Sequence, residues 1–170
     1  MSNIILIGFM GSGKTTVGKI LAKRMDRAFY DSDIEIEKKI GMSVKEIFDL
    51  KGEAEFRVME TQMLHELAKK EDVVIATGGG IVKNEKNIEI LKTTGILFFL
   101  NTDIDVIISR LEHDNSRPLL ETENKIQQMK ELLNERMGLY KKYCDFEIVS
   151  TDMEQICQFV SEKEELYSRK

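Results

Sequence analysis

The stretch Gly8-Phe9-Met10-Gly11-Ser12-Gly13-Lys14-Thr15 decides the fold of this chain. It satisfies the pattern Gly-x4-Gly-Lys-[Ser/Thr], in which the glycines let backbone N–H groups turn inward around phosphate oxygens. An apolar run at residues 3–7 leads into the stretch, and a pattern of helical period at residues 14–25 follows it. A strand, a glycine-rich loop and a helix N-terminus in this order predict a phosphate-binding P-loop. The alternative is a glycine-rich turn before an ordinary helix.

The residues of the P-loop are expected to bind the phosphates of a nucleotide, which we expect to be ATP. Lys14 is expected to reach the β- and γ-phosphates and to take part in catalysis, while the Thr15 hydroxyl ligates Mg²⁺. No Asn-Lys-x-Asp motif follows a strand candidate, so the sequence lacks the base-specifying element of a GTPase. The residues of this stretch that are expected to bind ATP are Gly11, Ser12, Gly13, Lys14, Thr15 and Thr16.

Outside the P-loop, short apolar runs alternate with longer stretches of helical period. The runs lie at residues 3–7, 28–30, 73–76, 96–100 and 146–149. The helix candidates lie at residues 14–25, 32–40, 44–50, 53–69, 85–92, 104–111, 123–143 and 153–168. This alternation predicts an α/β fold with three layers, α/β/α, around a parallel sheet of five strands. Because the runs are apolar throughout, we expect their strands to be covered on both faces.

The totals place the chain among single-domain proteins. A length of 170 residues is enough for one core, so residues 1–170 are expected to form one domain, and a monomer is expected. The net charge of −5 argues against a nucleic-acid partner. The longest apolar run is far shorter than the ~20 residues that span a bilayer, which argues against a membrane partner. The two cysteines, Cys144 and Cys157, lack metal-site spacing, and no signal-peptide pattern is present, so we expect a cytoplasmic protein.

Two segments exceed what a simple crossover between strands requires. Residues 32–70 separate two strand candidates, so we expect part of them, about 32–60, to project as a substrate-binding flap. Residues of about 112–122 are polar and contain the single proline, Pro118, which predicts an exposed lid loop. Closure of this lid would bring Arg117 to the transferring phosphoryl group, where it would act in catalysis and ATP binding. The alternative is that Arg117 is simply solvated.

Two aspartates follow the second apolar run, at the edge of the sheet that a P-loop also occupies. Asp31 is expected to help hold Mg²⁺, directly or through water. Asp33 is expected to accept a hydrogen bond from a substrate hydroxyl and to orient or deprotonate it. The competing interpretation is helix N-capping by Ser32 or Asp33, and both functions are compatible.

Arginines and glycines supply the remaining candidates. Arg57 stands four residues after Glu53, so an exposed helical ion pair explains it as well as a substrate contact does. Arg136 follows an acidic residue on a long amphipathic pattern and has the same two explanations. The triplet Gly78–Gly80 follows a strand and predicts a backbone that a ligand approaches closely, or else only a tight turn.

The order of these motifs resembles the shikimate kinase family over about the first 145 residues. The motifs that carry the resemblance are the P-loop, Asp31-x-Asp33, Gly52-Glu53-x-x-Phe56-Arg57-x-x-Glu60, Gly78-Gly79-Gly80, Arg117-Pro118-Leu119-Leu120 and Arg136-x-x-x-Tyr140. The resemblance implies a P-loop kinase fold and transfer of the γ-phosphoryl group of ATP to the 3-hydroxyl of shikimate, with Mg²⁺ bridging phosphates. ATP and shikimate are therefore the expected partners.

The resemblance also implies roles for single residues. Asp33 would bind the hydroxyls of shikimate, and Arg57 and Arg136 would clamp its carboxylate. The backbone of Gly78, Gly79 and Gly80 would pack against the substrate. Arg117 would meet the phosphates from the lid, and Arg110 would lie against adenine.

The sequence departs from the family pattern in two places. Gly138 stands where a proline is often found, and residues 150–155 contain no proline where the family often has one beside adenine. Alternative functions are another small-molecule kinase, such as a gluconate or nucleoside-monophosphate kinase, and a catalytically silent binding module of the same fold. The argument against the silent module is that its catalytic candidates are all present: Lys14, Thr15, Asp31, Asp33 and Arg117.

Overall fold

A parallel β-sheet forms the centre of the computed structural model, which describes residues 2–112 and 123–168. Its strands are β1 (Asn3–Ile7), β2 (Ala28–Asp31), β3 (Val73–Ala76), β4 (Gly95–Leu100) and β5 (Phe146–Ile148). They are arranged in the order β2-β3-β1-β4-β5, and every neighbouring pair is parallel. The prediction of a five-stranded parallel sheet is confirmed.

The helices follow the predicted pattern closely. They are α1 (Lys14–Arg24), α2 (Ser32–Ile40), α3 (Val44–Leu67), α4 (Glu85–Lys92), α5 (Ile104–Glu112), α6 (Glu123–Tyr143) and α7 (Met153–Ser168), with a short 3₁₀ helix, η1 (Ile81–Lys83). The two helices predicted at 44–50 and 53–69 are the two arms of α3, which are separated by a kink at Gly52 (φ 83°, ψ 165°). Only glycine adopts this backbone conformation without strain, which explains the break.

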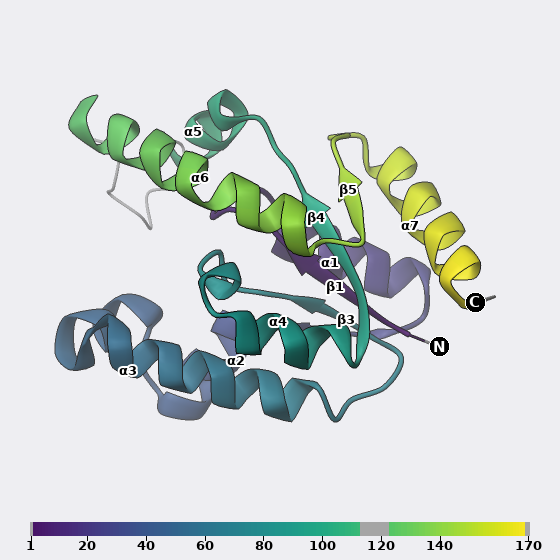
Figure 1. The fold of residues 1–170 in the computed structure, drawn as a ribbon, viewed down its shortest axis with the longest axis horizontal. Coiled ribbons are helices and arrows are strands. Elements are labelled where there is room, and N and C mark those ends of the chain that lie inside the picture. Colours follow the sequence, from purple (N-terminus) through teal and green to yellow (C-terminus); the bar gives the residue numbers. More distant parts are fainter. Residues whose placement is uncertain (1, 113–122, 169–170) are drawn as a thin grey trace.

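Helices cover both faces of the sheet and complete three layers (Figure 1). On one face, residues of α1 and α7 pack against the strands in a core that includes Leu21 and Val160. On the other face, residues of α3, α4 and α6 form a second core that includes Leu64, Leu91 and Tyr140. The predicted α/β/α architecture is therefore confirmed.

Burial differs between the central and the edge strands. Every residue of β1, β3 and β4 is buried, as their unbroken apolar sequences predict. The expectation is wrong for β2 and β5: Ala28 is exposed and Phe146 is only half-buried. Both strands lie at the edges of the sheet, where one flank has no neighbouring strand.

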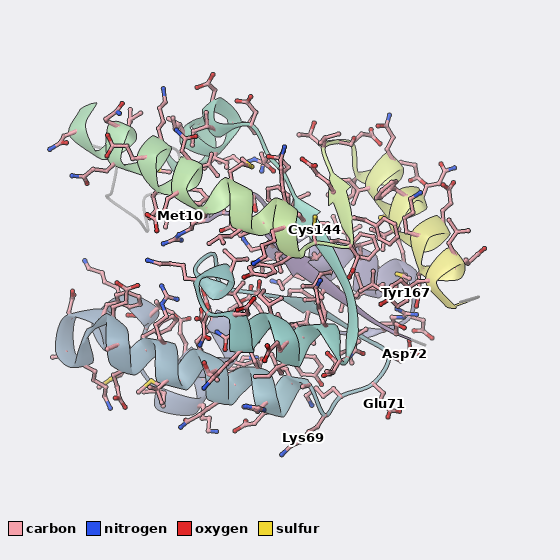
Figure 2. All side chains as sticks on the ribbon, viewed as in Figure 1. Met10, Lys69, Glu71, Asp72, Cys144 and Tyr167 are labelled. Carbon is pink, nitrogen blue, oxygen red and sulfur yellow. The ribbon has the colours of Figure 1, made fainter. Side chains whose placement is uncertain are left out.

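The carboxyl ends of the strands meet at one end of the molecule. Figure 2 shows Met10, just beyond β1, at this end, while Glu71 and Asp72, which precede β3, lie at the opposite end. In parallel sheets, ligands bind in the crevice outside the carboxyl ends of the strands. The predicted site residues at 8–16, 31–33 and 78–80 all follow strands at this end.

Two helical units extend on either side of the Met10 end. The helices α2 and α3 lie together on one side, and α5 and α6 lie on the other (Figure 1). Most of the predicted lid, residues 113–122, lies outside the described residues, and with it Arg117. Within residues 2–112 and 123–168, no helix is long and apolar enough to cross a membrane.

Candidate active site

The P-loop folds around the N-terminus of α1. Gly11 and Gly13 have φ angles of 73° and 97°, in the left-handed region that favours glycine. Gly13 is the N-cap of α1, and no side chain there caps the helix. The N-terminus of α1 therefore lacks a side-chain cap, and the partial positive charge of a helix terminus favours an anion there.

The side chain of Lys14 lies inside the P-loop. Its side-chain Nζ donates to the carbonyl oxygens of Gly8 (2.8 Å) and Phe9 (2.7 Å) and to Ser12 Oγ (3.4 Å). The residue is only 8% exposed, so these contacts fix an ammonium group beside the helix N-terminus. Two sources of positive potential thus coincide where phosphates are predicted to bind.

Thr15 and Asp31, the two predicted metal ligands, are in direct contact. Thr15 Oγ1 donates to Asp31 Oδ2 at 2.6 Å. Asp31 Oδ1 accepts from the N–H groups of Asp33 (3.1 Å) and Ile34 (3.3 Å), so Asp31 is the N-cap of α2. The alternative of capping by Ser32 or Asp33 is wrong, because Asp31 is the residue with extended backbone at that position.

A cavity of about 200 Å³ adjoins the P-loop on the side of α7. Arg110 lies against it and donates from Nη1 to the carbonyl oxygens of Ser12 (3.1 Å) and Gly11 (3.4 Å). The buried Thr102 donates from Oγ1 to the Ser12 carbonyl at 3.0 Å. The cavity is lined by Ser12, Gly13, Thr16, Val17, Leu100, Thr102, Arg110, Ser150, Thr151, Met153 and Ile156.

The glycine triplet is surrounded by the other predicted acceptor residues. A Cβ atom on Gly78 would lie 2.7 Å from Oδ1 of Asp33 and 2.9 Å from Oε1 of Glu60. A Cβ atom on Gly79 would lie 3.1 Å from the backbone N of Met10, so the triplet also abuts the P-loop. A Cβ atom at either position would force its neighbours to shift, which supports the interpretation of a closely approached backbone over that of a simple turn.

Arg57 makes the ion pair that its spacing predicts and also reaches the triplet. Its Nη2 lies 2.9 Å from Glu53 Oε1, and its Nη1 lies 3.0 Å from Glu60 Oε1. A Cβ atom on Gly80 would be only 2.5 Å from both terminal nitrogens of Arg57. The guanidinium also lies 5.4 Å from the ring centroid of Phe56, a cation–π distance. The two explanations of Arg57 are thus compatible.

Arg136 approaches the triplet from the opposite side, on α6. It is 6% exposed, so the explanation of an exposed helical ion pair is wrong. Its Nη1 donates to the carbonyl oxygen of Gly79 at 3.1 Å, and Tyr140 Oη, one helical turn later, donates to the same oxygen. Two arginines from different helices therefore meet at one glycine triplet.

Burial shapes the protonation of this cluster. It raises the pKa of Glu60, against the lowering effect of Arg57, and the charge of Asp33 raises it further. For Arg57, burial lowers the pKa, but the carboxylates of Glu60 and Glu53 outweigh it and keep the guanidinium charged. Burial raises the pKa of Tyr140 to about 12, so its hydroxyl is a permanent donor at neutral pH.

The structure thus brings together every predicted site residue that it describes. Arg117 lies outside the described residues. Three polar contacts were not assigned from the sequence. Glu60 and Tyr140 belong to motifs that were quoted without a role for either residue. Thr102 carries no motif, and its only signal is its position just after the fourth strand.

The chain is similar to shikimate kinases in sequence. The family model of shikimate kinase matches residues 10–165. The shikimate kinase of Caldicellulosiruptor bescii is 46% identical over 153 residues, which are 90% of this chain and 88% of that protein. The shikimate kinase of Thermodesulfovibrio yellowstonii is 48% identical over 142 residues, covering 84% of this chain and 82% of that protein.

Solved structures agree with the sequence matches. The shikimate kinase of Acinetobacter baumannii, solved in complex with shikimate, aligns with a TM-score of 0.89 at 39% identity, over 100% of this chain and 95% of that one. A gluconokinase from Sinorhizobium meliloti aligns with a TM-score of 0.58 at 16% identity, over 99% of this chain and 97% of that one. The second match shows a common fold alone.

Proposed function

The chain belongs to the shikimate kinase family, a family of ATP-dependent kinases, and we propose on this basis that it phosphorylates shikimate. The reaction transfers the γ-phosphoryl group of ATP to the 3-hydroxyl of shikimate. A P–O bond forms to the hydroxyl oxygen, the bond to the β-phosphate oxygen breaks, and the hydroxyl proton is released. The products are shikimate 3-phosphate and ADP.

One observation carries this proposal: Asp33, Arg57 and Arg136 converge on the glycine triplet beside the P-loop. Two guanidinium groups suit one planar carboxylate, because each presents N–H donors in a fixed fork. A carboxylate such as Asp33 suits a polyol, since it accepts hydrogen bonds from hydroxyls. Shikimate has both groups, whereas a nucleotide acceptor would add a phosphate that requires further cations.

The nucleotide would occupy the other half of the site. The N–H groups of the P-loop and Lys14 would bind the phosphates, and the cavity beside Arg110 would take the adenine ring. Arg117 remains a predicted lid residue that meets the transferring phosphoryl group. In the transition state, negative charge spreads over the oxygens of the transferring phosphoryl group. Positively charged groups beside those oxygens therefore contribute most to catalysis.

Magnesium fits the pair formed by Thr15 and Asp31. A hydroxyl and a carboxylate oxygen are hard donors, and the two side chains are already in contact at 2.6 Å. Among the described residues, no group of three or more histidine, cysteine, aspartate or glutamate side chains forms a metal cage. A magnesium ion at this pair would be held chiefly by substrate phosphates and water. Bound there, Mg²⁺ would neutralise charge on the β- and γ-phosphates.

Asp33 would act on the acceptor rather than on the nucleotide. Its carboxylate lies over Gly78, close to the triplet that is proposed to hold the substrate. From there it would accept the hydrogen bond of the 3-hydroxyl and orient or deprotonate that hydroxyl for attack on the γ-phosphorus.

The further organisation is part of the same proposal. We expect one kinase domain over residues 1–170, with a flap at about 32–60 and a lid at about 112–122. The same proposal includes a monomer located in the cytoplasm. The net charge of −5 supports the part of it that excludes a nucleic-acid partner.

A coupled ADP-release assay tests the function directly. The enzyme receives ATP and Mg²⁺ with shikimate, and with quinate, gluconate or AMP in parallel. Turnover that depends on shikimate and exceeds turnover with the other acceptors is the expected result. Turnover with gluconate or AMP instead would refute the proposal. ATP binding without turnover on any acceptor would point to the silent binding module.

A further inference from the structure

The carbonyl oxygen of Gly79 accepts two hydrogen bonds from one helix. Tyr140 Oη donates the first, and Arg136 Nη1 donates the second at 3.1 Å. The donors stand four residues apart on α6, so they project from the same face of that helix. A carbonyl oxygen has two lone pairs, and here both are in use.

Tyr140 is held rigidly enough to act as an anchor. It is completely buried, and its ring stacks on Phe99 of β4 with centroids 4.9 Å apart and planes inclined by 14°. The stacking fixes the ring, and the ring fixes the position of the hydroxyl. Burial raises the pKa of Tyr140 to about 12, so the hydroxyl keeps its proton and donates throughout the working range of an enzyme.

The anchored carbonyl determines where the next N–H group points. The Gly79–Gly80 peptide is trans and planar, so its N–H points opposite to its C=O, away from α6. The N–H groups of Gly79 and Gly80 donate to no other residue within the described part of the chain. Consecutive glycines have little intrinsic preference for one orientation, so the orientation depends on the anchors.

Arg136 is oriented by the same contact. Its Nη1 is fixed on Gly79, while its buried Nε has no hydrogen-bond partner among the residues that the structure describes. A buried guanidinium N–H without a partner is costly unless a ligand supplies one. If the Tyr140 hydroxyl were removed, the Gly79 carbonyl would lose one of its two donors, and Arg136 would bond to a less firmly held acceptor.

We propose that Tyr140 is a positioning residue for the acceptor, which acts through Gly79 and Arg136 to preorganise the site that receives the substrate carboxylate. This inference rests on the proposed function. Tyr140 contacts neither substrate in this role. Its contribution should therefore appear in the binding of shikimate and spare both the nucleotide and the chemical step.

Tyr140→Phe is the direct test, because it removes the hydroxyl and retains the ring that stacks on Phe99. The KM for shikimate should rise about tenfold, the loss expected for one hydrogen bond in a buried site. The kcat should change by less than about threefold, and the affinity for ADP by less than about twofold. Calorimetric titration with ADP also reports the folded fraction, and KM does not depend on that fraction.

Tyr143→Phe is the matched control. Tyr143 stands on the same helix, and its hydroxyl contacts Lys142 (3.3 Å) and Glu85 (3.4 Å) rather than the glycine triplet. This variant should keep the KM for shikimate of the unmodified enzyme. An unchanged KM in Tyr140→Phe would overturn the inference, as would an equal loss of shikimate and ADP affinity, which marks a purely structural role. An unmodified enzyme that does not turn over shikimate would refute the proposed function instead.

Discussion

The carboxylate of Asp33 lies so close to Gly78 that a Cβ atom on the glycine would be 2.7 Å from Oδ1. Asp33 belongs to α2 and Gly78 to the loop after β3, and the neighbouring strands β2 and β3 bring these segments together. Ser32 reinforces the contact, because its Oγ accepts from the Gly78 N–H at 3.1 Å. The acidic group and the glycine backbone thus form one surface, on which the acceptor hydroxyl is proposed to rest.

Asp33→Ala should abolish phosphoryl transfer while nucleotide binding persists. Loss of a group that orients or deprotonates the acceptor costs about 10²–10⁴ in kcat. The affinity for ADP, measured by calorimetry, should change by less than about twofold, because the phosphates bind at the P-loop. Asp49→Ala removes an exposed aspartate of α3 and serves as the control. Turnover near the normal rate in Asp33→Ala would refute the role of Asp33.

Arg57→Lys should weaken shikimate binding about tenfold or more. A lysine keeps the charge but cannot form the forked pair of hydrogen bonds that a carboxylate accepts from a guanidinium. Shikimate titrations compare this variant with Arg24→Lys, which alters an exposed ion pair with Glu154. If both variants bind shikimate equally well, Arg57 is only a partner of Glu53 and Glu60.

Glu60→Gln should change how stability depends on pH. Burial raises the pKa of Glu60, so the folded state binds its proton more tightly than the unfolded state does. The contribution of Glu60 to stability is therefore fully present below its unfolded-state pKa and is lost as the pH rises through its folded-state pKa. Relative to Glu60→Gln, the unmodified protein should gain in Tm as the pH falls from about 7 to about 5.

Thermal denaturation across this pH range gives the comparison. Glu55→Gln, which removes an exposed carboxylate of α3, should give a Tm difference that does not follow the same trend. A Tm difference between the unmodified protein and Glu60→Gln that falls with falling pH would contradict the assignment of burial as the dominant effect.

Gly138→Ala should stabilise the protein. Gly138 lies exposed within α6, and a Cβ atom there would meet nothing within 4 Å. Replacing glycine by alanine inside a helix adds about 0.5–1 kcal/mol to the free energy of unfolding. In a protein of this size the Tm should rise by about 2–4 °C per kcal/mol.

Gly18→Ala is the opposite case and makes the test sharper. Gly18 is in α1, where a Cβ atom would lie 2.4 Å from the ring of Phe29, so the same substitution should lower the Tm. Equal effects of the two substitutions would show that intrinsic helix propensity, and not packing, determines the outcome.

Most of the fold could be predicted from the sequence because local patterns determine it. Central strands read as unbroken apolar runs, and helix ends were predicted within a few residues. The break between the helices predicted at 44–50 and 53–69 matches the kink of α3 at Gly52, whose backbone conformation favours glycine. The N-cap of α2 was predicted incorrectly as Ser32 or Asp33, because the choice among neighbouring capping residues depends on which one has extended backbone, and here that is Asp31.

Site residues that belong to a sequence motif could be predicted. Roles that depend on tertiary contacts could not. Spacing alone could not decide whether Arg57 forms an ion pair or contacts the substrate. In the structure the guanidinium pairs with Glu53 and also lies against Gly80, in the glycine triplet where the substrate is proposed to bind. Arg136 had a surface explanation until its burial was known. The hydrogen bond from Thr102 to the Ser12 carbonyl joins residues 90 positions apart in the sequence, and no sequence motif predicts it.

Gly13, with its left-handed backbone, is the N-cap of α1 and has no side chain to cap the helix. Most helices close their first turn with a serine, threonine or aspartate side chain, and this one has none. The phosphate oxygens of ATP would act as acceptors for backbone N–H groups at this terminus. The helix would then be capped by its ligand and not by a side chain. Nucleotide binding and the completion of secondary structure are then one event, and hydrogen exchange at the start of α1 becomes a direct gauge of occupancy.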